Sequence, residues 1–558
     1  MTGEATPAKR VPIRLACTLV LMRDGASGLE VLLLRRVASA AFLGGAYVFP
    51  GGAVDPGDSH EDVLSRVRGL TREEARARLA LEEDDALRHW VAAVRECFEE
   101  SGVLLARDAA GHPVDALRMR ALQPARRALH AGTLSFAEFL RTEDLFVHAS
   151  DLAYADHWIT PAGRPRRFDT RFFWARAPHD HEESADRVET VHAEWVAPGE
   201  ALARGESGAM EIAFATGQVL RGIARWPRVD DALAHVRALP RIEPTQPVIA
   251  QGSRGPVIFR RGDAAYDEVR WSDPEETTTT SYDIVPGVAK RLDPHVLRIV
   301  APNPGVMTGP GTNSYLVGGD ELAVIDPGPD LASHLDAIVR EGNGRIRWIF
   351  CTHTHLDHSP AAAKLKALTG AQVVGAPPAF PERQDATFAP DVVPVDGATY
   401  AVGGLVLEAI HTPGHASNHF CYQSRQTGML WSGDHVMQGS TVIVNPPDGD
   451  MRAYLASLHK LLARDIAIIA PGHGYLIGRP HEEIRRLVAH RMQREARVLE
   501  HLAQRAPCTV LDLVPGVYAD VPADRHRAAA RSLLAHLQKL VAEGTVREEG
   551  GKFSFASH

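Results

Sequence analysis

Apolar residues in the first part of the chain fall into short runs separated by turn-forming residues. Residues 14–22 (RLACTLVLM) and 29–34 (LEVLLL) predict two buried strands, and Asp24-Gly25 predicts the turn between them. The apolar spacing of residues 91–104 predicts a helix. Later apolar runs predict further strands at 168–174 and 194–196.

The second part of the chain alternates short apolar runs with helical patterns, which is typical of an α/β domain. The predicted strands lie at 314–317, 321–325, 347–351 and 372–374, with a helix at 331–340. Beyond residue 478 the pattern changes. The pattern there predicts a long charged helix at 481–504, a second helix within 522–542, and a two-stranded wing at 543–546 and 552–555. This tail is similar to a small winged-helix domain.

Residues 244–283 carry few apolar stretches and include the polar runs 273–276 and 277–280, so we place a domain boundary there. A chain of 558 residues is also too long for a single core. The sequence therefore predicts a multidomain α/β protein. Its expected parts are residues 11–240, a linker or extension at 241–284, a third part at 285–480 and a tail at 481–558.

Composition narrows the class of protein. An apolar content of 45% and a charged content of 23% are ordinary for soluble globular proteins, and a net charge of -9 gives no overall attraction to nucleic acid. Five scattered cysteines argue against a disulfide framework. No apolar run approaches the ~18 residues that span a bilayer, and the polar N-terminus lacks a secretory signal. We expect a cytoplasmic protein that does not enter a membrane.

Metal-ligand residue types are concentrated in the second half of the chain. Imidazole and carboxylate groups are those that hold divalent cations such as zinc. Four of them lie within six residues, directly after the predicted strand 347–351, and three more each follow a glycine. The seven are His353, His355, Asp357, His358, His415, Asp434 and His473.

The spacing of these residues predicts two cation sites. Residues two apart leaving a strand point the same way, so His353 and His355 can bind one cation, which His415 completes. Asp357 and His358 face a second cation together with His473, and the two oxygens of Asp434 suit a bridge. Two such cations lower the pKa of water toward ~7 and make hydroxide available.

This ordered set resembles the metallo-β-lactamase fold over roughly residues 285–479, and 326–328 (DPG) matches a loop of that family. The resemblance implies an αββα sandwich with two zinc ions at one edge, and it implies that Asp357 orients the attacking hydroxide. Residues 303–317 and the tail are similar to the beta-lactamase-like protein 2 group, some members of which cleave single-stranded RNA.

A second cluster of carboxylates lies in the first half. Glu96, Glu99 and Glu100 are spaced to share one helix face, where like charges destabilise an isolated helix and a bound Mg²⁺ or Mn²⁺ would stabilise it. Gly102 allows the helix to end, and a glycine-rich turn at 49–58 lies upstream.

Together these features resemble an enlarged Nudix box, and the likeness covers about residues 11–240. By resemblance, Glu96, Glu99 and Glu100 bind the divalent cation, and Arg95 orients the carboxylates. Two departures stand out. Asp58 replaces the first Glu of the box, and 36 residues separate it from Arg95 where the box has seven. The subgroup with such boxes includes coenzyme A diphosphatases.

The sequence thus predicts a two-module metal-dependent hydrolase. The Nudix-like α/β/α sandwich would cleave nucleoside diphosphate or CoA derivatives, with Glu96 and Glu99 in catalytic positions. The metallo-β-lactamase-like part would cleave an ester, thioester or phosphodiester. The alternative is a single-strand endoribonuclease guided by the winged helix, with the Nudix part acting only as a ligand sensor. We expect small-molecule substrates rather than RNA, and a tail that packs or forms a homodimer contact.

Late-helix arginines leave the nucleic-acid alternative open. Five arginines on the long charged helix could contact an RNA backbone: Arg485, Arg486, Arg491, Arg494 and Arg497. Acidic residues are interleaved with them, which favours a salt-bridged helix surface.

Overall fold

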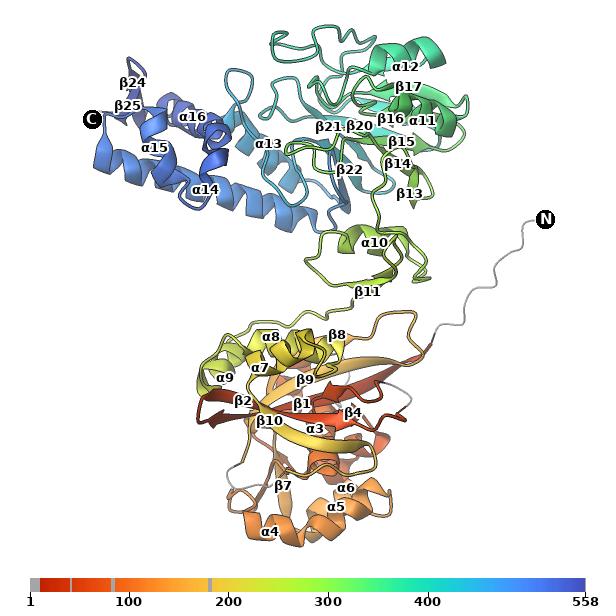
Figure 1. The fold of residues 1–558 in the computed structure, drawn as a ribbon, viewed down its shortest axis with the longest axis vertical. Helices are drawn as coiled ribbons and strands as arrows, with labels where there is room; N and C mark the ends of the chain where they lie inside the picture. The colour runs from red at the N-terminus through yellow and green to blue at the C-terminus, as the bar shows by residue number, and fades with distance from the viewer. Residues whose placement is uncertain (1–10, 41–42, 82–85, 179–182, 557–558) are drawn as a thin grey trace, which may run out of the picture. The chain divides into compact units, whose positions relative to one another are not determined.

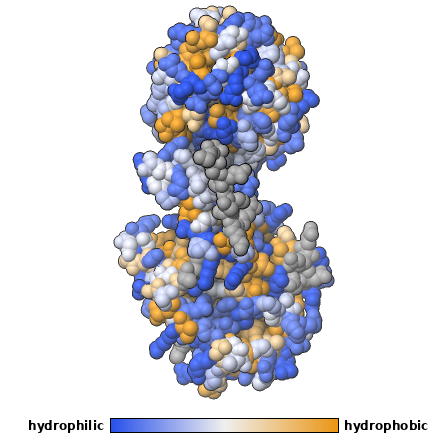
Figure 2. All heavy atoms as spheres, turned by 90° about the vertical axis from the view of Figure 1, so that its right-hand side faces the viewer, coloured by the Kyte–Doolittle hydropathy of each residue, from blue (hydrophilic) through white to orange (hydrophobic). Residues whose placement is uncertain are grey.

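The structure is a computed structural model that describes residues 11–40, 43–81, 86–178 and 183–556. The chain divides into two compact units, Met1–Pro247 and Val248–His558 (Figure 1). Across the face shown in Figure 2, hydrophobic residues are interspersed among hydrophilic ones. Among the described helices, none combines the length and the apolar character needed to cross a bilayer.

The first unit is built on a mixed sheet with strand order β10-β2-β1-β9-β8, extended by β3 and β4. A second, three-stranded sheet has the order β5-β7-β6. The strands are β1 (Ile13–Gly25), β2 (Gly28–Arg36), β3 (Tyr47–Val48), β4 (Gly51–Ala53), β5 (Val67–Arg68), β6 (Ala106–Asp108), β7 (Leu145–His148), β8 (Ala153–Ile159), β9 (Arg167–Arg176) and β10 (Thr190–Val196).

Helices cover both faces of the large sheet, as expected for an α/β/α sandwich (Figure 1). Leu19 and Leu21 of β1 pack toward α3, and Val20 and Met22 pack toward α7, α8 and α9. The helices are η1 (Pro56–Ser59), α1 (Glu61–Leu64), α2 (Arg72–Leu79), α3 (Arg88–Ser101), α4 (Ala116–Ala121), α5 (Gln123–His130), α6 (Phe136–Thr142), η2 (Ala149–Asp151), α7 (Pro198–Glu206), α8 (Phe214–Ile223) and α9 (Val229–Arg237).

The predicted turn at Asp24-Gly25 is wrong by two residues. Both belong to β1, where they pair with Leu29 and Gly28, and the turn falls at 26–27. The carboxylate of Asp24 instead accepts a hydrogen bond from the Val229 backbone N–H at the start of α9 (3.0 Å). The predicted helix 91–104 is confirmed in its body, but it ends at Ser101, because Gly102 adopts a left-handed conformation (φ 76°).

The second unit contains two sheets that face each other, with strand orders β13-β14-β15-β16-β17-β18 and β19-β20-β21-β22-β23. A shared core lies between them, and α11 and α12 cover one outer face while α13 covers the other, which gives the expected αββα sandwich (Figure 1). The strands are β13 (Lys290–Asp293), β14 (Val296–Val300), β15 (Asn313–Gly318), β16 (Leu322–Ile325), β17 (Ile346–Phe350), β18 (Gln372–Val374), β19 (Thr399–Val402), β20 (Leu405–His411), β21 (Phe420–Ser424), β22 (Met429–Gly433) and β23 (Ile468–Pro471). The helices are α11 (Ala332–Gly342), α12 (Ala362–Thr369) and α13 (Met451–Leu462).

The segment expected as a linker has structure of its own within the second unit. It forms a two-stranded sheet, β11 (Val248–Ala250) with β12 (Val257–Phe259), and the helix α10 (Tyr266–Ser272). Glu268 of α10 is fully buried and binds Arg298 of β14 (2.5 and 2.9 Å) and Lys290 of β13 (2.6 Å). This ionic contact attaches α10 to the first sheet of the sandwich.

The predicted elements of the tail are confirmed. They are α14 (Pro480–Arg505), α16 (His526–Ala542) and the wing strands β24 (Val546–Glu549) and β25 (Lys552–Phe555), of which β24 begins three residues later than expected. Two further elements, α15 (Val510–Val517) and η3 (Ala523–Arg525), were not predicted. The tail has its own core, and the first turns of α14 and residue Ala535 of α16 also pack with α13. The winged helix therefore packs directly against the sandwich through α13.

Candidate functional site

The seven predicted ligand residues meet at loops that follow strands of both sheets. His353, His355, Asp357 and His358 follow β17, whereas His415, Asp434 and His473 follow β20, β22 and β23. Their ligand atoms form three overlapping groups, each within 4.8 Å. The groups are His353 with His355 and His415; His353 with His358 and Asp434; and Asp357 with His358 and His473.

Distances within the cluster separate two poles. At one pole, His355 Nδ1 lies 2.9 Å from His353 Nε2 and 3.1 Å from His415 Nε2. At the other, Asp357 Oδ2 lies 3.4 Å from the Nε2 atoms of both His358 and His473. The cluster can therefore offer separate nitrogen and oxygen donors to two cations.

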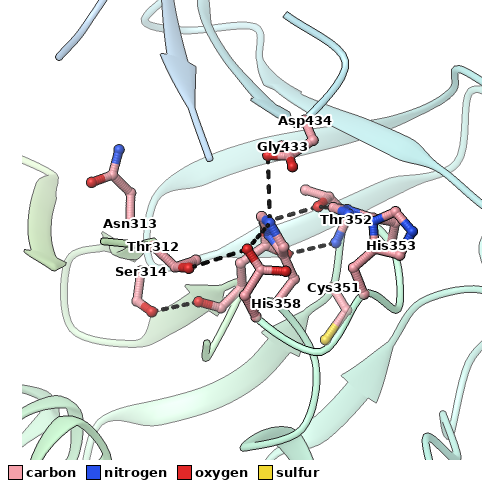
Figure 3. Close-up of polar contacts among 12 residues, drawn as sticks. Thr312, Asn313, Ser314, Cys351, Thr352, His353, His358, Gly433 and Asp434 are labelled. Atoms are coloured by element: carbon pink, nitrogen blue, oxygen red, sulfur yellow. Dashed lines mark hydrogen bonds and ion pairs between the residues drawn. The ribbon is translucent and has the colours of Figure 1, made fainter. Parts of the chain in front are cut away.

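Asp434 lies between these poles. Its Oδ1 is 3.4 Å from His358 Nε2 (Figure 3). The same oxygen is 3.3 Å from His473 Nε2, and Oδ2 is 3.7 Å from His415 Nε2. One carboxylate oxygen thus faces each pole, which is the placement that a bridging ligand requires.

The second nitrogen of four of these histidines is held by a neighbour. His415 Nδ1 donates to the Ile443 carbonyl (2.8 Å) and His473 Nδ1 to the Gly311 carbonyl (3.2 Å). His358 Nδ1 lies 2.9 Å from Asp326 Oδ2, and His353 Nδ1 lies 3.0 Å from the Thr352 hydroxyl. Such contacts fix the rings and leave each Nε2 free to bind a metal.

Asp326 has a role in the site that sequence reasoning did not assign. It adopts a left-handed conformation (φ 49°) directly after β16. Its carboxylate accepts hydrogen bonds from the Thr352 N–H (2.7 Å) and hydroxyl (2.8 Å) as well as from His358. The only signal in the sequence was its place in the 326–328 loop.

Burial and the neighbouring carboxylates shift the pKa values of the histidines in opposite directions. Burial lowers the pKa of His355 to about 4 and that of His353 well below its usual range, so both imidazoles are neutral ligands. Burial also opposes protonation of His358, but nearby carboxylates raise its pKa. His358 Nε2 and Asp434 Oδ1 are buried and make no hydrogen bond of their own, and a cation would satisfy both.

The carboxylates of α3 form a second candidate site, beside the glycine-rich turn. The Gly51 N–H donates to Glu100 Oε2 (2.8 Å). A Cβ at Gly52 would lie 2.5 Å from Glu96 Oε2, so the turn packs directly on that carboxylate. Within the described residues, however, the compact three-ligand groups all lie in the second unit, and Glu96, Glu99 and Glu100 are not brought that close together.

Asp58 takes a defined place despite the long insertion. Its two oxygens accept hydrogen bonds from Arg95 Nε (2.8 Å) and Nη2 (2.9 Å). Arg95 Nη1 also donates to Glu96 Oε1 (2.9 Å). The 36-residue separation is therefore closed in space by one bidentate ion pair.

Burial affects the protonation of these glutamates. It raises the pKa of Glu96 to about 7 and raises the pKa values of Glu99 and Glu100 as well. Arg95 and the Gly51 N–H thus compensate these charges only in part, and a hard divalent cation would stabilise them further.

Arg126 is a further residue that the sequence did not indicate. It donates to the carbonyls of Glu99 and Glu100 (3.0 Å each) at the end of α3. These bonds hold the last turn of the helix that carries the acidic residues.

Known protein families match three parts of the chain. The NUDT19 Nudix domain matches residues 13–220, the metallo-beta-lactamase superfamily matches 307–473, and the beta-lactamase associated winged helix domain matches 509–553. A beta-lactamase-like protein 2 homolog of Drosophila melanogaster is 32% identical over 288 residues, which cover 47% of this chain and 93% of that protein. The chain belongs to the metallo-beta-lactamase superfamily. Within this superfamily its relatives are beta-lactamase-like protein 2, and an N-terminal Nudix domain precedes the shared region.

Further similarities are found to a curated protein and to a solved structure. An atrochrysone carboxyl ACP thioesterase of Aspergillus fumigatus is 30% identical to this metallo-beta-lactamase superfamily member, with 42% of this chain and 76% of that protein covered. A solved NUDIX hydrolase from Alicyclobacillus acidocaldarius is 32% identical, covering 40% of this chain and 96% of that one, with a TM-score of 0.34. The predicted families and fold classes of all three parts are confirmed, and the chain is a hydrolase. Both catalytic families generally bind divalent metals.

Proposed function

We propose that the second unit is a two-zinc hydrolase whose favoured substrate is an acyl thioester. The observation that supports it most is the convergence of seven ligand side chains from four loops. His353, His355 and His415 would hold one ion; Asp357, His358 and His473 would hold the other; and Asp434 would bridge them. Zinc, when bound, supplies a Lewis acid and lowers the pKa of water. Asp357 would also orient the attacking water.

Exposed apolar residues beside the cluster favour an acyl substrate. Val306 and Met307 are 89% and 56% exposed, on a hairpin closed by hydrogen bonds between Gly305 and Gly309 (2.8 and 3.1 Å). Leu356, between two ligand residues, is 65% exposed. The hairpin leads to Gly311, whose carbonyl accepts a hydrogen bond from His473, so the hairpin joins the chain at the site. An apolar rim suits a hydrocarbon chain better than a phosphodiester.

Metal analysis and a substrate panel test this proposal. We expect two zinc ions per wild-type chain, and fewer in the His353→Ala and Asp434→Ala variants, because each removes a ligand. Thioester hydrolysis should fall with the zinc content. Unchanged zinc content in both variants, measured by plasma mass spectrometry, would rule out the assignment. Acyl thioesters, esters and short RNA are compared on the same preparation.

The endoribonuclease remains the second candidate, because the chain carries a winged helix. Four of the five named late-helix arginines are, however, used within the protein. Arg486 binds Glu483, whereas Arg485 is exposed. Arg491 and Arg494 are buried, and Arg497 binds Asp520. RNA affinity that falls steeply with added salt would support this candidate, and no binding at low salt would remove it.

We propose that the first unit hydrolyses the diphosphate bond of a nucleoside diphosphate or CoA derivative with Mg²⁺ or Mn²⁺. Glu96, Glu99 and Glu100 would bind the cation, and the contacts of Arg95 with Asp58 and Glu96 support its orienting role. The raised pKa values of the three glutamates support a cation site. A ligand sensor without turnover is the alternative for this unit.

A further inference from the structure

The winged-helix tail forms hydrogen bonds with the 442–444 loop, which orients the candidate metal ligand His415. His415 Nδ1 donates to the carbonyl of Ile443. On either side of Ile443, Arg491 of α14 donates to the Val442 carbonyl (2.5 Å), and Val444 N–H donates to the Ser532 hydroxyl of α16 (3.3 Å). The residues that carry the His415 partner are thus fixed from outside the sandwich.

Arg491 makes a second contact toward the same ligand. Its guanidinium lies 5.4 Å from the ring centroid of Tyr454, on α13. A Cβ at Gly414, the residue before His415, would lie 2.3 Å from Tyr454 Cα, so these backbones are in close approach. Arg491, 2% exposed, therefore supports both the loop that accepts from His415 and the tyrosine packed behind it.

The other pole of the cluster is held without the tail. His358 is oriented by Asp326 and His473 by the carbonyl of Gly311, both of which lie within the sandwich. A disturbance at Arg491 should accordingly reach only the ion bound by His353, His355 and His415.

We infer that Arg491 and Ser532 are positioning residues for His415, so that the winged helix forms part of the structure that completes one of the two metal sites. The inference rests on the proposed function, because it takes the cluster as a metal site. It assigns to the tail a role in the hydrolase site that does not depend on nucleic acid.

Arg494 provides a matched control on the same helix. Like Arg491 it is buried, lies over a tyrosine ring (Tyr518, 4.3 Å) and donates to a backbone carbonyl (Val517, 2.6 Å). All of these contacts are inside the tail. Arg491→Met and Arg494→Met thus remove equivalent groups, and only the first touches the 442–444 loop.

The test is a zinc titration of the full chain against a competing chelator, with Co²⁺ absorption spectra as a second readout. We expect Arg491→Met to weaken one of two sites about tenfold, the magnitude typical of outer-shell ligand partners, and to change the cobalt spectrum. Arg491→Lys, which keeps one donor for Val442, should recover part of the affinity. Arg494→Met should titrate like the wild type.

Two further outcomes separate the hypotheses. A wild-type chain that binds no zinc defeats the proposed function itself. A wild type with two sites, but with the same affinities in Arg491→Met as in Arg494→Met, overturns the positioning role alone. Should Arg491→Met not fold, Ser532→Ala takes its place, with a weakening at the same single site expected and unchanged affinities at both sites counting against the inference.

Discussion

Asp326 joins two parts of the ligand loop at once. Its carboxylate binds the Thr352 backbone and hydroxyl before the loop's first ligand, and it binds His358 at the loop's end. A single side chain therefore sets the conformation in which both ends of the loop face the cluster.

We predict that Asp326→Asn lowers zinc affinity about 10- to 100-fold at the site that contains His358, because an amide cannot accept from all three donors. Chelator competition measures the change. Asp330→Asn is the control, since Asp330 lies four residues on in an exposed pair with Lys364. Equal zinc affinities in the two variants would contradict the role of Asp326.

The residues that meet in the cluster could be picked out from the sequence, but the groups that orient their side chains could not. His415 and His473 follow glycines at loop positions, and that pattern can be read from the sequence. The groups that orient them are backbone carbonyls of Ile443 and Gly311, which have no sequence signature. The contact of Arg126 could not be predicted from the sequence either, because it depends on α5 lying beside the end of α3.

At the scale of elements, strongly periodic segments were predicted well and short polar ones were not. The four predicted strands of the second unit, β15 to β18, and the helix α14 follow their apolar patterns closely, whereas β19 to β23 of the second sheet were not predicted. The segment around α10 has too few apolar residues to indicate structure. It is fixed by the ion pairs of Glu268 with Arg298 and Lys290, which are 30 and 22 residues away. Such long-range pairing is not readable from local sequence.

We predict that Glu268→Gln lowers the free energy of unfolding at pH 7 by about 3–5 kcal/mol, because it leaves Arg298 buried without its partner charge. Hydrogen exchange of β13 and β14 measures the loss. Glu482→Gln, which removes an exposed partner of Arg479, should change it by less than about 1 kcal/mol.

The same variant has a defined pH dependence. Burial disfavours the ionised carboxylate, but Arg298 and Lys290 lower the pKa of Glu268 below its ordinary 4.5. Its contribution to stability is therefore present above pH 4.5 and is lost as the pH falls through the lower folded-state pKa. The difference between the wild type and Glu268→Gln should narrow below that pH. A difference that widens there would contradict the ion pair.

At the scale of the whole molecule, two units each carry a core and a candidate site. The glutamates of α3 lie in Met1–Pro247, and the histidine cluster lies in Val248–His558. Each candidate site draws its proposed ligand residues from its own unit, so we expect the two sites to be silenced separately.

We predict that the double variant Glu99→Gln, Glu100→Gln lowers diphosphate hydrolysis about 100-fold or more, while kcat/KM for thioester hydrolysis stays within about twofold. Parallel assays of both reactions on one preparation measure this, and Glu73→Gln on the exposed face of α2 serves as the control. Nucleotide binding without wild-type turnover would instead identify the first unit as a sensor.

The bonds of Glu268 also set an order of events during synthesis. Its carboxylate binds Arg298 and accepts from the Leu476 N–H (3.2 Å), 208 residues further along the chain. Arg298 in turn donates to the carbonyl of Gly474. Until the ribosome has translated Leu476, the pair of Glu268 and Arg298 lacks two of its hydrogen-bond partners, the Leu476 N–H and the Gly474 carbonyl. The sandwich can therefore close over α10 only late in translation, after most of the hydrolase has already left the exit tunnel.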